Sequence, residues 1–116
     1  MKQEIIDRYQ AEASVFSALA HPTRLFVLHQ INNASHSVTE LAQMAGIDIS
    51  TMSKHLDLLK RYNIIRGEKD KNAVYYKLSI PCLLDFMKCA KQMTSCQSEC
   101  RIICKEYTQL REGDAG

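Results

Sequence analysis

The sequence predicts an α+β chain that is mainly helical, and three observations support this fold class. Apolar residues recur at the helical period through residues 4–19 and again through residues 22–32. Two shorter helical segments follow, separated by a connection of only three or four residues. Two β-rich stretches then flank a polar turn. With 116 residues, 46% of them hydrophobic, the chain is long enough for one domain, 1–116, with a real core.

The first two helices are separated by a proline. The first is expected at about 4–19, and its apolar face carries Ile5, Tyr9 and Phe16. Because proline lacks the N–H that an interior helical position needs, Pro22 fits the first turn of the second helix. We expect that helix to end near Asn33.

The third and fourth helices are predicted from their caps. Ser37 and Glu40 have the spacing of a capping box, in which the serine bonds forward and the glutamate bonds back, and Gly46 ends the helix. Asp48 is a suitable cap for a fourth helix at about 49–62. The residues expected to be buried are Leu41 and Met44 in the third helix and Ile49, Met52, Leu56 and Leu59 in the fourth.

The opposite side of the fourth helix is polar. It carries Ser50, Ser53, Lys54, Asp57 and Arg61. This side suits a DNA major groove, and it also fits an ordinary solvated surface. The next segment favours DNA, because Ile64–Lys69 and Ala73–Leu78 predict a hairpin with Lys69 and Lys71 near its tip. A helix-turn-helix followed by a basic hairpin is the winged arrangement, whose lysines can reach phosphates.

Four segments carry a family resemblance. Leu19–Leu28, with the sequence LAHPTRLFVL, resembles the opening signature of the ArsR/SmtB family of transcriptional repressors. Val38–Ala42 resembles the start of the family's third helix, and Val74–Leu78 resembles its closing wing strand. Ser50–Leu56 resembles its recognition helix. The matching segments span roughly residues 15–80 in the family's order.

The resemblance implies a winged helix-turn-helix repressor that binds double-stranded operator DNA as a homodimer. The implied DNA-binding core is about 22–79, and the implied dimerisation helices are about 4–19 and 81–110. The candidate DNA contacts are Ser50, Thr51, Ser53, Lys54, His55, Arg61, Lys69 and Lys71. His55 lies toward the edge of the apolar side, where local packing competes with base reading. The resemblance also implies release by a bound inducer, commonly a toxic metal or metalloid ion.

Two familiar ligand sets of the family are absent. The metalloid-responsive members have a cysteine pair at the start of the helix that here begins at Ser37, and this sequence has no cysteine there. The zinc-sensing members use carboxylates and histidines on the last helix, but no histidine follows His55. A zinc or nickel sensor is therefore not expected, because imidazole and carboxylate are usual ligands of these ions.

The last helix instead carries cysteines. If it runs unbroken over 81–110, all the cysteines lie within an arc of about 80°; they are Cys82, Cys89, Cys96, Cys100 and Cys104. Cysteine also packs as a small apolar residue, so Cys82 and Cys89 are suited to burial in a dimer seam, the line along which the helices of two subunits would pack. Cys89 is also a candidate metal ligand.

Cys96, Cys100 and Cys104 are the main candidate metal ligands, because i, i+4 neighbours are only about 6 Å apart along a helix. Cys96 and Cys104 are roughly 12 Å apart, so three-thiolate binding needs a kink or a thiol from a partner subunit.

Thiolates without histidine select soft ions. By analogy with the family, the expected inducer is trivalent arsenic or antimony, followed by cadmium, lead or mercury. Reversible oxidation by an oxidant or a reactive sulfur species is the rival inducer chemistry. A small metal-handling protein without DNA binding is the alternative from another class.

The sequence contains no catalytic motif, so an enzyme is not expected, and no cofactor is required. Neither a signal peptide nor an apolar run of about 18 residues is present. A cytoplasmic protein without a membrane span is therefore expected.

Overall fold

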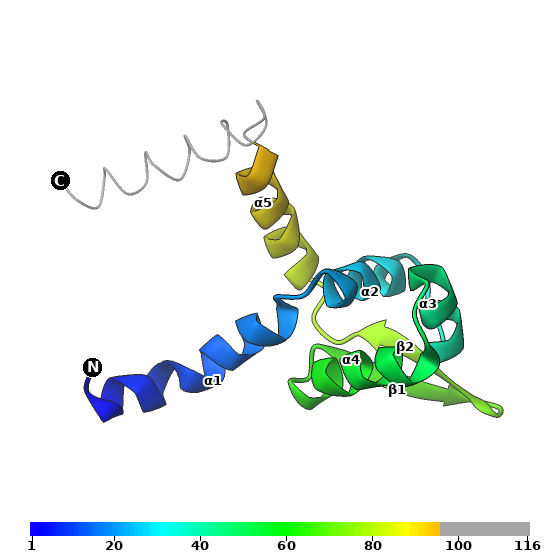
Figure 1. Cartoon of the computed structure of the whole chain (residues 1–116), viewed down its shortest axis with the longest axis horizontal. Coiled ribbons are helices and arrows are strands. Elements are labelled where there is room, and N and C mark those ends of the chain that lie inside the picture. The colour runs from blue at the N-terminus through cyan, green and yellow to red at the C-terminus, as the bar shows by residue number, and fades with distance from the viewer. Residues whose placement is uncertain (96–116) are drawn as a thin grey trace. The chain divides into compact units, whose positions relative to one another are not determined.

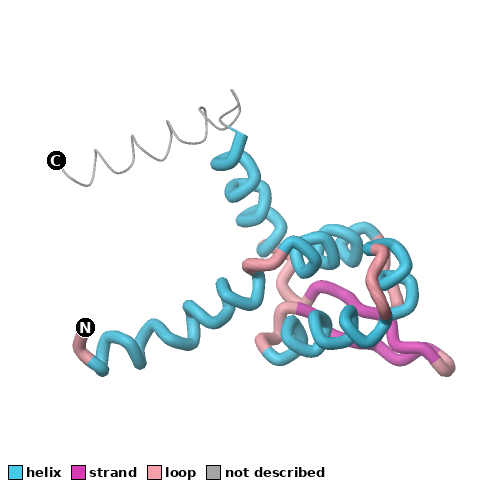
Figure 2. The backbone as a smooth tube through the Cα atoms, viewed as in Figure 1, coloured by secondary structure: helices cyan, strands magenta, loops and turns pink. Residues whose placement is uncertain are grey.

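The structure is a computed structural model that describes residues 1–95 (Figure 1). The chain divides into two units, Met1–Pro81 and a second unit that begins at Cys82. The elements in order are α1 (Gln3–Leu19), α2 (Pro22–Asn33), α3 (Val38–Ala45), α4 (Ile49–Arg61), β1 (Ile65–Asp70), β2 (Ala73–Leu78) and α5 (Leu83–Ser95). Figure 2 distinguishes the helices from the single hairpin of the described residues. This mainly helical α+β arrangement with a helix-turn-helix and a wing confirms the predicted fold class.

The predicted break between α1 and α2 is confirmed. Pro22 is the first residue of α2, and the His21 side chain caps that helix, because its Nδ1 accepts a hydrogen bond from the Thr23 N–H at 3.1 Å. Only Ala18 and Leu19, at the end of α1, are buried. Most side chains of this helix are therefore not buried by the rest of the first unit.

The caps of α3 and α4 are formed largely as predicted. The Ser37 Oγ accepts a hydrogen bond from the Glu40 N–H at 3.3 Å, which is the forward half of the capping box. The back half differs, because the Glu40 Oε2 lies 2.8 Å from the His36 Nδ1 instead of bonding back to the serine N–H. Gly46 ends α3 with a φ of 72°, a left-handed conformation that favours glycine.

The core of the first unit is formed by α2, α3, α4 and the start of β1. Its fully buried side chains are Val27, Leu28, Leu41, Met52, Leu56, Leu59 and Ile64. Two predictions of burial are wrong, since Met44 is 45% exposed and Ile49 is 50% exposed. Met44 lies on the flank of the α3 face that carries Leu41, and Ile49 is the first residue of α4, where no preceding turn covers it.

The wing is an antiparallel hairpin in register from Ile65 opposite Leu78 to Asp70 opposite Ala73. Lys71 in its turn has a φ of 58°. A Cβ at Gly67 would lie 2.8 Å from the Val74 Cγ1, so a larger residue at this position would displace the Val74 side chain. Along β2, Val74 is exposed, whereas the other residues of the strand are half-buried.

The second unit is described only as far as Ser95. Its helix α5 begins at Leu83, two residues later than predicted, so Cys82 precedes the helix and its carbonyl accepts from the Asp85 N–H at 3.2 Å. Cys82 and Cys89 are exposed free thiols. Cys96, Cys100 and Cys104, and the predicted continuation to residue 110, lie outside the described residues. No helix within residues 1–95 is long and apolar enough to span a membrane.

Candidate nucleic-acid interface

The first turn of α4 is built around the Asp48 carboxylate. Its Oδ1 accepts from the Thr51 hydroxyl at 2.7 Å, and its Oδ2 accepts from the Thr51 N–H at 3.1 Å and from the Ser50 hydroxyl. The hydroxyls of Ser50 and Thr51, together with this backbone N–H, lower the pKa of Asp48 to about 2. Asp48 is therefore negatively charged at neutral pH, at the start of the second helix of the helix-turn-helix.

The predicted polar side of α4 is present. Ser50, Thr51, Lys54 and Arg61 are exposed, while Ser53 is half-buried. Within residues 1–95, no acid forms an ion pair with Lys54 or Arg61. Arg61 lies in the last turn of the helix, where its charge complements the helix dipole.

His55 differs from the other candidates on α4, because its half-buried ring is held by neighbours inside the unit. The Arg24 Nη1 donates to the His55 Nδ1 at 3.2 Å, and the His21 and His55 ring centroids are 4.6 Å apart. Arg24 also donates to the Ala18 carbonyl at 2.5 Å. Burial lowers the pKa of His55, and electrostatic interactions of its protonated form with the neighbouring His21 and Arg24 lower it further. These contacts link α1, α2 and α4.

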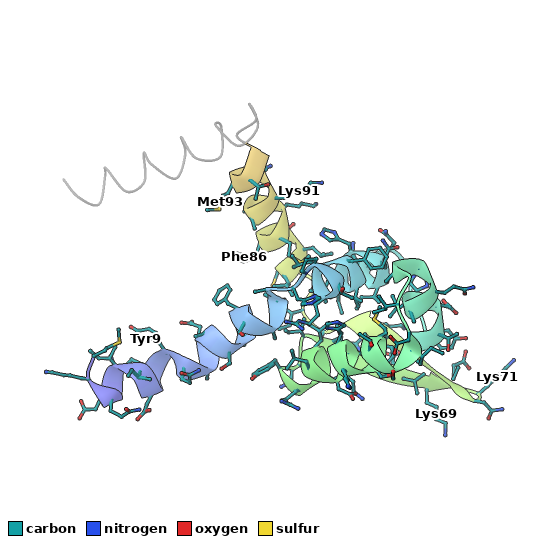
Figure 3. All side chains as sticks on the ribbon, viewed as in Figure 1. Tyr9, Lys69, Lys71, Phe86, Lys91 and Met93 are labelled. Carbon is teal, nitrogen blue, oxygen red and sulfur yellow. The ribbon has the colours of Figure 1, made fainter. Side chains whose placement is uncertain are left out.

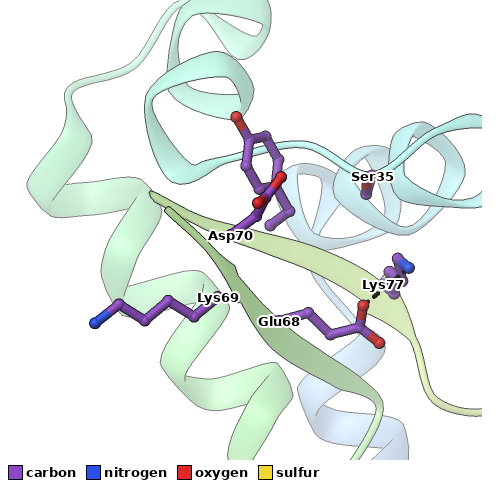
Figure 4. Close-up of a pocket in the computed structure, with 6 residues that line it drawn as sticks. Ser35, Glu68, Lys69, Asp70 and Lys77 are labelled. Atoms are coloured by element: carbon purple, nitrogen blue, oxygen red, sulfur yellow. Dashed lines mark ion pairs between the residues drawn. The ribbon is translucent and has the colours of Figure 1, made fainter. Parts of the chain in front are cut away.

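In the wing, some basic side chains form ion pairs with an acid and others do not. Glu68 Oε2 lies 2.9 Å from the Lys77 Nζ, and its Oε1 lies 3.3 Å from the Arg66 Nε. These two cations hold the pKa of Glu68 below its usual value, with Lys77 the stronger influence. Figure 4 shows Glu68 paired with Lys77 in a depression that Ser35 and Lys69 also line, with the Lys69 amine directed away from the pair.

Lys69 and Lys71 are exposed near the hairpin tip, as Figure 3 shows. Within residues 1–95, neither forms an ion pair. Their charges are therefore available to a phosphate, whereas those of Arg66 and Lys77 are shared with Glu68.

Sequence reasoning missed two features of this surface. The Arg24–His55 contact joins residues far apart in the chain, so no local pattern indicates it. The Asp48 cluster does have a local signal, because a capping aspartate is followed by hydroxyl residues two and three positions later. Within residues 1–95, no group of three or more histidine, cysteine, aspartate and glutamate side chains could hold a metal ion.

The chain is similar in sequence to known regulators. A helix-turn-helix domain family model matches residues 19–68. The uncharacterized HTH-type transcriptional regulator Rv0081 of Mycobacterium tuberculosis is 29% identical over 86 residues, which cover 73% of this chain and 75% of that protein. The HTH-type transcriptional repressor SmtB of the same species is 30% identical over 77 residues, 66% of this chain and 55% of that protein.

Solved structures of transcriptional regulators are also similar to this chain in fold. The crystal structure of Rv0081 aligns with a TM-score of 0.69 at 26% identity, covering 85% of this chain and 95% of that chain. A homodimeric winged helix-turn-helix DNA-binding domain from Mycobacterium bovis aligns with a TM-score of 0.71 at 20% identity, over 84% and 94% of the two chains, and supports the fold. These relatives are regulators and not enzymes, as the sequence predicts. In sequence and in fold, the chain is therefore similar to winged helix-turn-helix transcriptional regulators of the ArsR/SmtB type.

Proposed function

We propose that the protein is a repressor that places α4 in the major groove of its operator and the wing beside the phosphate backbone. The observation that carries this proposal is the charge on the exposed side of the helix-turn-helix and wing. Lys54, Lys69 and Lys71 are exposed cations without an acidic partner in residues 1–95. Phosphate contacts of this kind fix orientation and supply salt-dependent affinity, while the helix reads base edges.

DNA binding is tested with the promoter region of the protein's own gene. Fluorescence anisotropy in metal-free, reducing buffer should give tighter binding to this duplex than to a shuffled duplex of equal length and composition. Binding should weaken steeply with added salt, because counterions are released from the phosphates. Equal affinity for both duplexes would contradict operator recognition, and no binding to either would contradict the proposal as a whole.

We infer a homodimer in which α1 packs against a second copy of the chain. Ile5, Tyr9 and Phe16 recur on one side of α1, and each of these side chains is at least 43% exposed. A large contiguous apolar patch on the surface of a soluble protein marks an interaction site. The homodimeric domain from M. bovis, which shares the fold, is consistent with this assembly.

We infer that the repressor is released by a thiophilic ion bound through Cys96, Cys100 and Cys104, with Cys89 a further candidate ligand. The support is chemical, because thiolates four residues apart suit soft ions and no histidine follows His55. Trivalent arsenic or antimony is the first choice, followed by cadmium, lead or mercury. Addition of arsenite to the repressor–operator complex under reducing conditions should release the DNA.

Thiol oxidation is the second candidate for the inducing event, because clustered cysteines oxidise reversibly. The exposed thiols of Cys82 and Cys89 show that oxidants can reach cysteines at the start of this unit. Release by peroxide or polysulfide, reversed by dithiothreitol, would favour this alternative. Release by arsenite in the presence of reductant would favour metalloid sensing. The alternative of a metal-handling protein without DNA binding is disfavoured, because the relatives are named as transcriptional regulators.

A further inference from the structure

We propose that the first turn of α4 reads A·T base pairs, accepting a hydrogen bond from the adenine amine and packing Ile49 against the thymine methyl group. This inference rests on the proposed placement of α4 in the major groove. It assigns a specificity role to Asp48 and Ile49, neither of which was among the candidate DNA contacts.

The hydroxyl groups of Ser50 and Thr51 are both used as donors within this turn. A serine or threonine hydroxyl has one hydrogen to donate and two lone pairs that accept. In this structure both Ser50 and Thr51 donate that hydrogen to Asp48. Their oxygens can therefore only accept hydrogen bonds from a further partner. The exposed groups of this turn consequently form a cluster of acceptors around a carboxylate.

A cluster of acceptors can recognise only base edges that donate hydrogen bonds. In the major groove only the adenine N6 and cytosine N4 amines donate hydrogen bonds, whereas guanine presents two acceptors. Acceptors and a negative charge attract an amine and disfavour guanine O6 and N7. The same charge repels a phosphate, so this helix N-terminus is suited to a base edge instead of the backbone.

Ile49 can distinguish an A·T pair from a G·C pair. Ile49 is 50% exposed at the first position of the helix, directly after Asp48. Thymine carries a C5-methyl group in the major groove, separated from the amine of its paired adenine by thymine O4, and cytosine lacks that methyl. An exposed apolar side chain at the same end of the helix as the acceptor groups therefore suits the methyl and the amine of one A·T pair.

The test uses modified DNA, so it does not depend on a variant folding. Each thymine of the bound promoter duplex is replaced in turn by deoxyuridine, which lacks the methyl, and each adenine by purine deoxyribonucleoside, which lacks the amine. We expect at least one A·T pair per half-site at which both replacements weaken binding. The methyl should account for about 4-fold in affinity, the value of one buried methylene-sized group.

Two variants then assign the contacts. Ile49→Ala should bind thymine and deoxyuridine duplexes equally while keeping its response to the missing amine. Asp48→Asn keeps a helix-capping residue but adds a donor, so it should tolerate guanine at the same position. Asp85→Asn, an exposed acid in the first turn of α5, is the matched control and should retain the wild-type preference.

The outcomes separate this inference from the proposed function. Operator-specific binding that is unaffected by every deoxyuridine and purine replacement would overturn the A·T reading and leave the repressor proposal standing. A second contrary result is that the base replacements weaken binding of Ile49→Ala and Asp48→Asn by the same factors as they weaken binding of the wild type. That result would also overturn the A·T reading, because residues other than Ile49 and Asp48 would then read the pair. Absence of any DNA binding by the wild-type protein would overturn both.

Discussion

At the scale of single residues, the neighbours of each charge decide whether it is available to DNA. Lys69 and Lys71 have no acidic partner within residues 1–95, whereas Glu68 lies between Arg66 and Lys77. Two charges of the same sign on one hairpin can therefore contribute differently to DNA binding. A count of basic residues along the sequence does not show this difference.

Removing the Lys71 charge should weaken binding to operator and random DNA by similar factors. Asparagine is the suitable replacement, because it tolerates the left-handed backbone at this position, where φ is 58°. The slope of log affinity against log salt should fall by about one unit, since one phosphate contact is lost. Lys54→Ala should instead reduce discrimination between the two DNAs. Equal losses on both DNAs for Lys54→Ala would assign Lys54 to the backbone.

Protonation of His55 should destabilise the protein. The folded-state pKa of His55 is lowered, mainly by burial, so the unfolded chain binds more protons as the pH falls below the ordinary histidine value of about 6.5. The contribution of neutral His55 to the free energy of unfolding is complete above a pH of about 6.5. It is lost as the pH falls through the lowered folded-state pKa. The neutral ring accepts from Arg24 at Nδ1, and a protonated Nδ1 cannot.

Thermal unfolding measured between pH 7.5 and 5 checks this expectation. His55→Gln keeps an acceptor without a titrating group, so its melting temperature should depend less on pH than that of the wild type. His29→Gln, at an exposed histidine, is the control and should keep the wild-type dependence. An unchanged pH dependence in His55→Gln would show that other groups cause it.

At the scale of elements, the sequence predicts what depends on local chemistry and misses what depends on tertiary contacts. The helix boundaries follow from Pro22, Ser37, Gly46 and Asp48, whose caps act within one turn of chain. Glu40 illustrates the opposite case, because its carboxylate contacts His36 instead of completing the capping box. Periodicity also assigns Ile49 to the buried side although the start of a helix has fewer neighbours to cover it.

A charge on the apolar side of α1 should dissociate the dimer. Tyr9→Glu places a carboxylate on the side of α1 that also carries Ile5 and Phe16, where pairing would bury it. Sedimentation at micromolar concentration should give a dimer for the wild type and a monomer of 13.2 kDa for the variant. Ala11→Glu, exposed on another side of the same helix, should remain dimeric. A monomeric wild type would contradict the proposed assembly.

At the scale of the whole molecule, repression and release require two sites whose occupancies are coupled. A coupling free energy of about 1–3 kcal/mol changes DNA affinity by roughly 5- to 150-fold, which is sufficient for a switch. Because the coupling is reciprocal, operator DNA should weaken inducer binding by the same factor. Measuring both affinities therefore tests whether the cysteines and the DNA-binding surface act as one system.

Among the cysteines, Cys100 should be indispensable for release. It is the only one within an i, i+4 step of two others, Cys96 and Cys104, so its loss removes both close thiol pairs. Cys100→Ser should bind operator as tightly as the wild type but stay bound when arsenite is added. Cys82→Ser should release normally, because Cys82 precedes α5 and lies seven residues before the nearest other cysteine, Cys89.

The triple replacement of Cys96, Cys100 and Cys104 by serine completes this test. If the triple variant and Cys100→Ser both release DNA like the wild type, these cysteines are not the sensor. Their spacing would then reflect packing in a dimer seam, where cysteine acts as a small apolar residue. If only the triple variant fails to release, the site tolerates loss of one thiol, and a thiol from a second subunit becomes the natural replacement. Mixed dimers of wild-type and Cys100→Ser subunits would then release with intermediate affinity for arsenite.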